Sequence, residues 1–143
     1  MKRTRAIVVD DDKLVLFIHK IMIEDCHPVW DTDYFPDSQS ALDYINAHAS
    51  SEIEFIIFLD ISMPKLNGWE MLDELEKNPF YHKMFIVLVT AFNSAEDKIK
   101  STRYKQVKAH IAKPFKTSDF NLLKANKALT SFFENSISTE SIN

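Results

Sequence analysis

The sequence predicts an α/β fold in which a doubly wound parallel sheet carries helices on both faces. Strand-like and helix-like segments alternate five times along the 143 residues, and such alternation implies right-handed crossovers between parallel strands. The run from Phe55 to Leu59 lacks the polar alternation of a half-exposed strand, which is typical of strands covered on both sides. A single domain is expected, because the chain is too short for two ordinary ones.

Five short segments are predicted to be strands. They are Ala6 to Val9, Val29 to Phe35, Phe55 to Leu59, Met84 to Val89 and Val107 to Ala112. The second alternates enough to be an exposed or edge strand. The first, third and fourth are apolar throughout and are expected to be the most buried, while the fifth is a shorter strand.

A helix is expected after each strand. Apolar spacing predicts that the first helix covers the sheet with Leu14, Phe17, Ile18, Ile21 and Met22, which leaves His19 at the surface. The second should begin at residues 36–38, and the third after Gly68, where Asn67 and Glu70 have the spacing of a capping box. The fourth should run from Ser94 to about Tyr104. The last should begin near Thr117 or Ser118 and bury Phe120, Leu123, Leu129 and Phe132 or Phe133.

The composition disfavours several classes of protein. A formal charge of -4 leaves no basic surplus for a polyanion, so no nucleic-acid partner is expected. No apolar run reaches the roughly 18 residues of a membrane helix, and no signal peptide is recognisable. The single cysteine, Cys26, cannot form an internal disulfide bond, which agrees with a reducing cytoplasm.

Polar residues stand where the predicted strands end. Asp10 and Asp11 follow the first strand, Asp60 the third, Thr90 the fourth and Lys113 the fifth. The carboxyl ends of parallel strands share one edge of the sheet, so these side chains should converge.

The converging residues suit phosphoryl chemistry. Carboxylates without histidine or thiolate partners favour Mg²⁺, and Lys113 and Thr90 can bind phosphoryl oxygens. Asp60 stands alone on its strand and is the better nucleophile, while Asp10 and Asp11 can hold the metal. Asp12 is expected to cap the first helix rather than to act as a third ligand.

The motifs VVDDD, LDISMP followed by NGWEML, VTA and AKPF occur in that order. Together they resemble the response-regulator receiver domain of two-component signalling, and the resemblance covers residues 5 to about 133. It implies a flavodoxin-like five-stranded sheet in the order 2-1-3-4-5, with a cis Lys113-Pro114 bond. Residues 1–133 would form the receiver domain and residues 134–143 a polar, frayed tail.

The resemblance also assigns roles to the site residues. Asp60 would be the phospho-acceptor, Asp11 a direct Mg²⁺ ligand, and Asp10 a ligand acting largely through water. The backbone carbonyl of Ser62 would be a further ligand. Thr90 would be the switch hydroxyl, and Lys113 would bind the phosphoryl group.

Three positions vary within the family pattern. His110 occupies the place of the rotating aromatic switch, where its imidazole can act sterically or titrate near neutral pH. Ser62 and Phe92 would line the mouth of the site and tune hydrolysis of the acyl phosphate. We expect Phe92 to shield the phosphoryl group and slow self-dephosphorylation.

The implied function is a stand-alone phosphorelay response regulator. It would receive a phosphoryl group from a sensor histidine kinase or a histidine phosphotransfer protein. A downstream protein would bind the face formed by the fourth helix, fifth strand and fifth helix, including parts of residues 95–104 and 117–127. The same face could support a homodimer, and no membrane association is expected.

Two other readings stay open. The chain could be a receiver-like binding module that is never phosphorylated, although all five key residues are present. It could instead be a Mg²⁺-dependent phosphatase with an aspartyl nucleophile, since Asp10 and Asp12 have the required DxD spacing. Against the phosphatase, Leu14 stands where such enzymes need Thr or Val, and the chain lacks room for their large cap. No turnover of a free substrate is therefore expected.

Overall fold

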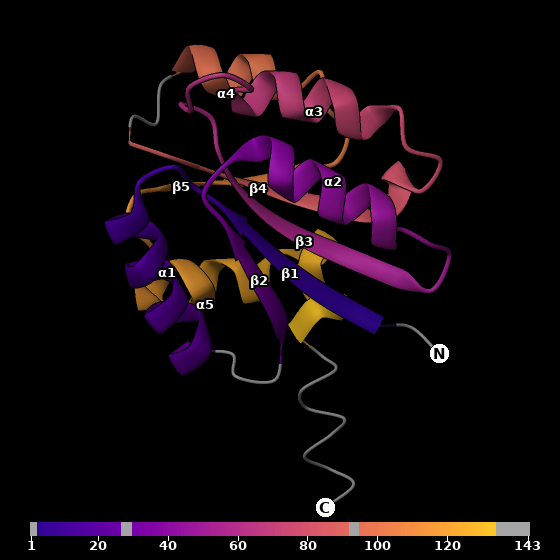
Figure 1. Cartoon of the computed structure of the whole chain (residues 1–143). Helices are drawn as coiled ribbons and strands as arrows, with labels where there is room; N and C mark the ends of the chain where they lie inside the picture. The colour runs from indigo at the N-terminus through magenta and orange to yellow at the C-terminus, as the bar shows by residue number, and fades with distance from the viewer. Residues whose placement is uncertain (1–2, 27–29, 92–94, 134–143) are drawn as a thin grey trace, which may run out of the picture.

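The computed structural model describes residues 3–26, 30–91 and 95–133. They form a five-stranded parallel sheet in the order β2-β1-β3-β4-β5, with helices on both faces (Figure 1). The fold class and the strand order expected from the sequence are confirmed. The strands are β1 (Arg3–Val9), β2 (Asp31–Phe35), β3 (Ile53–Asp60), β4 (Met84–Thr90) and β5 (Val107–Ala112).

The helices form two layers. Figure 1 shows α2, α3 and α4 on one side of the sheet and α1 and α5 on the other. Their bounds are α1 (Lys13–Cys26), α2 (Ser38–His48), α3 (Gly68–Glu76), α4 (Ala95–Ser101) and α5 (Thr117–Ala125), with 3₁₀ turns at Tyr81–Lys83 and Lys127–Leu129. In the described residues, no helix is both long enough and apolar enough to cross a bilayer.

Strand β3 is the centre of the core. Every residue from Glu54 to Asp60 is buried, because alternate side chains face the two helical layers. Phe55, Ile57 and Leu59 pack in the cluster on the α2 and α3 side, whereas Ile56 and Phe58 pack with residues of α5 on the other side. This double burial explains why the strand lacks polar alternation.

Helix α1 turns a different face to the sheet than the sequence predicts. Leu14, Phe17 and Ile21 are 67%, 58% and 54% exposed, while His19 and Ile23 are buried. The predictions that the first three cover the sheet and that His19 lies at the surface are wrong. The helix has apolar residues on two sides, and spacing alone does not say which side meets the core.

The last helix is shorter than the spacing of apolar residues predicts. Helix α5 ends at Ala125, and Asn126 is extended, with its side chain accepting the N–H of Ala128 at 3.0 Å. The five predicted core positions are nevertheless buried: Phe120, Leu123, Leu129, Phe132 and Phe133. Helix α4 likewise ends at Ser101 rather than near Tyr104, and its predicted first residue, Ser94, lies outside the described residues.

The only glycine, Gly68, lies where the loop after β3 meets α3. The predicted capping box is present, with the Asn67 side chain accepting the Glu70 N–H at 2.9 Å and Glu70 accepting the Asn67 N–H at 3.0 Å. A Cβ on Gly68 would lie 2.7 Å from Ile61 Cα and 2.8 Å from the Asp60 carbonyl oxygen. Close backbone approach, rather than a positive φ, therefore requires glycine here; the described non-glycine residue with positive φ is Lys65.

Replacing Gly68 with alanine should destabilise the protein. Because the added methyl group meets backbone atoms, the Gly68→Ala variant should lose about 1–3 kcal/mol of unfolding free energy, measured by urea denaturation. The matched control is Glu76→Ala at the exposed end of the same helix, which should change stability by less than about 0.5 kcal/mol. Equal stability of the two variants would contradict the steric explanation.

Candidate functional site

The structure brings the polar residues at the strand ends together at one edge of the sheet. The Lys113 Nζ lies 2.9 Å from Asp10 Oδ2 and 2.8 Å from Asp60 Oδ2. Both carboxylates are only 1% exposed. Residues at the carboxyl ends of β1, β3 and β5, up to about 100 positions apart in the chain, therefore form one charged cluster.

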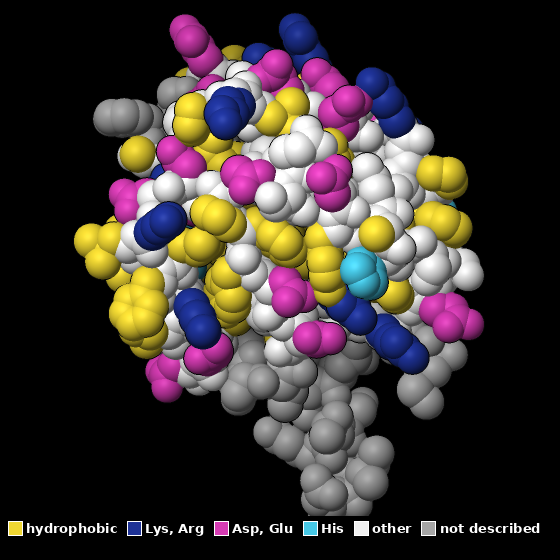
Figure 2. Space-filling view, in the orientation of Figure 1, with side chains coloured by type: hydrophobic (Ala, Val, Ile, Leu, Met, Phe, Trp, Pro, Cys, Tyr) yellow, Lys and Arg dark blue, Asp and Glu magenta, His cyan; other side chains and the backbone are white. Residues whose placement is uncertain are grey.

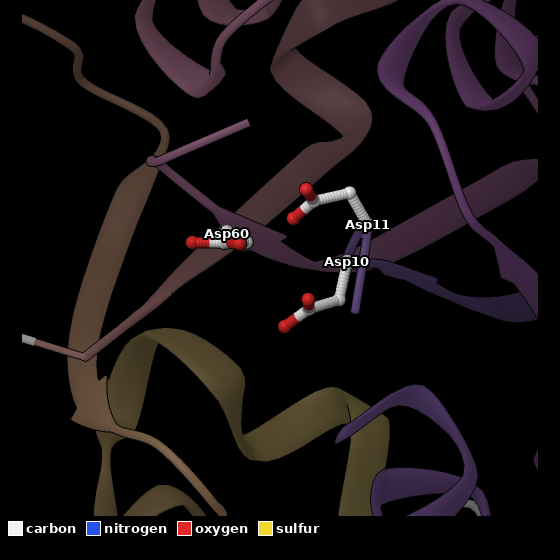
Figure 3. A group of neighbouring side chains, drawn as sticks. All are labelled: Asp10, Asp11 and Asp60. Carbon is white, nitrogen blue, oxygen red and sulfur yellow. The ribbon is translucent and has the colours of Figure 1, made fainter. Parts of the chain in front are cut away.

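Three carboxylates could hold a metal ion. Figure 3 shows Asp10 and Asp11 side by side at the end of β1, near Asp60 at the end of β3. One oxygen from each lies within 4.8 Å of the others. Asp11 is exposed, whereas Asp10 and Asp60 are buried. An all-oxygen donor set with an open side suits Mg²⁺, which keeps several water ligands.

Backbone hydrogen bonds orient the two buried carboxylates. Asp10 Oδ1 accepts the N–H of Asp12 at 2.9 Å, and Asp60 Oδ1 accepts the N–H of Ser62 at 3.1 Å. The second oxygen of each carboxylate is thereby left facing Lys113. Asp12 itself caps α1, since its Oδ1 accepts the N–H of Leu14 at 3.0 Å.

Two backbone features fix the position of Lys113, one before and one after its side chain. Its N–H donates to the Thr90 carbonyl oxygen at 2.9 Å, which joins the ends of β4 and β5. The Lys113-Pro114 peptide bond is cis, as the resemblance implies. Thr90 is buried beside this junction, and Ser62 is exposed at the rim. Phe92 lies outside the described residues, so its predicted role stays a prediction.

The charges of the cluster shift the pKa values of its members. Burial raises the pKa of Asp60, and Asp10 adds to this, against the opposing effects of Lys113 and the Ser62 N–H. Burial alone would lower the pKa of Lys113, but hydrogen bonds and charges from Asp60 and Asp10 outweigh it, so the pKa is raised. Lys113 is thus firmly cationic, while burial makes the ionised form of Asp60 less favourable than it is in water.

His110 is in β5, and its Nε2 lies 2.7 Å from the Oγ of Ser101, the last residue of α4. The Ser101 hydroxyl donates to the Lys98 carbonyl oxygen. Its single hydrogen is therefore used, and the Nε2–H of His110 is the donor to Ser101. Burial and the nearby charge of Lys98 lower the pKa of His110. A neutral imidazole at pH 7 favours the steric role over the titrating one.

His19, which the sequence predicts to lie at the surface, is buried beside the site. Its ring stacks on Phe115 with a centroid distance of 4.2 Å, and its Nε2 accepts the Phe115 N–H at 3.4 Å. Burial lowers its pKa to about 4, so the ring is neutral. His19 therefore packs directly behind the Lys113 segment. The signal that could have found it is a second stripe at three- and four-residue spacing: Leu16, His19, Ile23 and Cys26.

A parallel sheet with an acidic cluster and one lysine at its carboxyl edge defines a class of phosphoryl-receiving signalling domains. The family model described as the response regulator receiver domain matches residues 6–124. The chain belongs to this family. Its members are signalling modules of two-component systems that interact with histidine kinases or phosphotransfer proteins and generally bind Mg²⁺ at an acidic pocket.

Solved structures agree with this assignment. A two-component response regulator from Cytophaga hutchinsonii is 26% identical, with a TM-score of 0.74, and the match covers 85% of this chain and 93% of that one. A CheY-like receiver domain protein from Methanospirillum hungatei is also 26% identical, with a TM-score of 0.68, over 92% and 98% of the two chains. The chemotaxis protein CheY4 of Vibrio cholerae, at 18% identity, shares the fold, with a TM-score of 0.72 over 88% and 99%.

One curated relative is a probable methanogenesis regulatory protein, FilR2, of Methanothrix harundinacea. It is 22% identical over 89 residues, which are 61% of this chain and 57% of that protein. The chain thus spans little more than half the length of this relative.

Replacing Asp60 with asparagine should stabilise the metal-free protein at pH 7. The pKa of Asp60 is higher in the folded than in the unfolded protein, so folding favours the protonated carboxyl group. The free energy of unfolding is therefore higher at low pH and falls as the pH rises through the folded-state pKa. Asp60→Asn stays neutral, so its urea midpoint in chelator should exceed that of the wild type at pH 7. The difference should shrink as the pH falls toward 3.8, the ordinary carboxyl pKa.

The control is Asp43→Asn on the exposed side of α2, which removes the same formal charge. It should change the urea midpoint little at either pH. A lower midpoint for Asp60→Asn than for the wild type at pH 7 would show that ionised Asp60 stabilises the fold.

Proposed function

We propose that the protein is a phosphorelay response regulator in which Asp60 accepts a phosphoryl group from a phosphohistidine. The observation that carries the proposal is the position of the Lys113 ammonium, 2.8 Å from Asp60 and 2.9 Å from Asp10. The third carboxylate, Asp11, is exposed, so this edge of the sheet is open to solvent. The cationic lysine can bind a phosphoryl oxygen while a carboxylate oxygen of Asp60 meets the phosphorus.

The transfer forms one bond and breaks another. An Asp60 carboxylate oxygen attacks the phosphorus, and the phosphorus–nitrogen bond of the donor breaks, with its electron pair returning to the imidazole. The product is an acyl phosphate on Asp60. Mg²⁺ would be held directly by Asp11, Asp60 and the Ser62 carbonyl, and through water by Asp10. The ion would neutralise charge on the transferring group.

The acyl phosphate would act as a switch. It adds roughly two negative charges at the edge of the sheet. Thr90 would move toward the phosphoryl group, and His110 would turn inward and give up its hydrogen bond to Ser101 of α4. The face formed by α4, β5 and α5 would then change its shape for a downstream protein. Such a cytoplasmic switch needs no turnover of a free substrate.

Phosphorylation can be tested with acetyl phosphate and Mg²⁺. Intact-protein mass spectrometry should show the mass of one phosphoryl group on the wild type and none on Asp60→Asn, because the amide is a poor nucleophile. Beryllofluoride binding monitored by fluorescence would give an independent measure.

Each alternative has its own outcome in this experiment. No added mass on the wild type would favour the binding module that is never phosphorylated. Steady release of phosphate from a small phosphomonoester would favour the aspartyl phosphatase.

Helix α1 offers a docking surface for the phosphohistidine protein. Its exposed apolar residues Leu14, Phe17 and Ile21 follow one side of the helix, and Figure 2 shows hydrophobic side chains standing out from the surface where α1 lies. The helix begins three residues after Asp10. A donor whose imidazole reaches Asp60 would therefore cover this stripe as well.

The variant Phe17→Ser should slow phosphorylation by a protein donor and leave phosphorylation by acetyl phosphate unchanged. We expect a loss of about tenfold or more in the transfer rate, because an exposed aromatic anchor is removed. The rate would be measured with the phosphorylated histidine phosphotransfer protein that labels the wild type fastest.

The control is Leu122→Ser on α5, where the leucine is 71% exposed. This variant should keep the wild-type transfer rate. Equal rates for Phe17→Ser and the wild type would exclude α1 as the donor surface.

A further inference from the structure

The charges of this chain are segregated along the sequence. Residues 98–127 contain nine lysines and arginines but a single acidic residue, Asp119. The rest of the chain contains eight basic and twenty acidic residues. A protein with a net charge of -4 therefore carries one strongly basic segment.

The basic segment forms one edge of the folded sheet. It comprises the part of α4 that follows the acidic first turn with Glu96 and Asp97, the edge strand β5, and α5. Figure 1 shows α4 and α5 on opposite faces of the sheet, so that β5 lies between them. The Asn126 Nδ2 donates to the Lys108 carbonyl oxygen at 3.1 Å, which ties the end of α5 to β5. The three elements make a continuous surface, named here the basic edge.

A hollow of about 380 Å³ lies on the basic edge between α4 and β5. Lys98, Lys105 and Lys108 line it together with Ser101 and His110. The ion pairs between described residues join Lys77 to Glu74, and Lys113 to Asp10 and Asp60, so they leave these three lysines out. Lys108 Nζ donates to the Lys105 carbonyl oxygen at 2.7 Å, but no carboxylate neutralises its charge or that of Lys98 and Lys105 through an ion pair between described residues, so a partner can meet this positive charge.

Apolar side chains flank the same edge. Ile99 of α4 is 70% exposed and Leu122 of α5 is 71% exposed. Large apolar residues beside uncompensated lysines match a partner that has both carboxylates and apolar anchors.

We propose that the basic edge binds an acidic, partly apolar peptide segment of the downstream protein. A hollow of this size accepts a few side chains. A nucleic acid would extend past the basic edge and meet the acidic remainder of the chain, whereas a short acidic segment would not. His110 lines the hollow, so its inward turn on phosphorylation would change the shape of the hollow. This regulation of peptide binding rests on the proposed function.

The test uses a short fluorescein-labelled peptide of Glu, Leu and Ser, with an analogue in which every Glu is Gln. Fluorescence anisotropy with the full chain in Mg²⁺ and beryllofluoride should show binding of the Glu peptide that weakens as salt is added. The Gln analogue should bind about tenfold more weakly or worse.

Matched double variants locate the binding surface. Lys98→Glu with Lys105→Glu should weaken binding about tenfold or more, while Lys20→Glu with Lys77→Glu makes the same change in net charge and should have little effect. All four lysines are exposed, so both variants should fold, which thermal unfolding by circular dichroism would check.

Besides an absence of peptide binding, three results would overturn the inference. They are equal losses in the two double variants, equal binding of the Glu and Gln peptides, and tighter binding of a short DNA duplex than of the Glu peptide. The proposed function is tested separately by acetyl phosphate. Labelling of Asp60 without peptide binding would refute only the acidic partner. Peptide binding without any labelling would refute only the phosphorelay.

Discussion

The ion pairs of Lys113 with the buried carboxylates of Asp10 and Asp60 are the interaction on which the site depends. Two carboxylates that are nearly inaccessible to water repel each other, and one ammonium between them offsets part of that repulsion. The pKa of Asp60 is still raised, first because the carboxylate is buried and second because of the charge of Asp10. With Asp11 beside them, three carboxylates face one ammonium, and this excess of negative charge is a physical reason why a cation would bind there.

The fold supports this arrangement by surrounding it with rigid elements. β3 is buried on both faces and delivers Asp60 at its end. The Gly68 backbone packs against Ile61 and the Asp60 carbonyl oxygen, which holds the loop after β3 close to α3. On the other side, His19 of α1 packs against Phe115, two residues beyond Lys113. Both Asp60 and Lys113 are thus positioned by contacts outside the charged cluster.

The two proposed binding surfaces lie on different elements of the fold. The apolar stripe on α1 borders the acidic cluster, where the proposed phosphoryl donor would approach. The basic edge lies at β5, where His110 connects the interior of the sheet to α4 through Ser101. Donor and downstream partner would accordingly meet different chemistry on different elements, which allows one phosphoryl group to be received at one place and recognised at another.

The sequence by itself determined the fold class and the convergence of the site residues. Short apolar runs between turn signals are typical of buried strands, and the ends of parallel strands share one edge. The sequence therefore predicts that Asp10, Asp60, Thr90 and Lys113 lie together. The family motifs supplied the strand order. Capping at Asn67 and Glu70 was also predictable, because it depends on residues three positions apart.

Only the tertiary structure decided which side of α1 faces the core and where α5 ends. Helix α1 has two apolar stripes, and the choice between them depends on Phe115, which is distant in sequence and stacks on His19. The break after Ala125 depends on Asn126, which caps the next turn and bonds to β5. In both cases local spacing is ambiguous, because the deciding contact is made with another element of the fold.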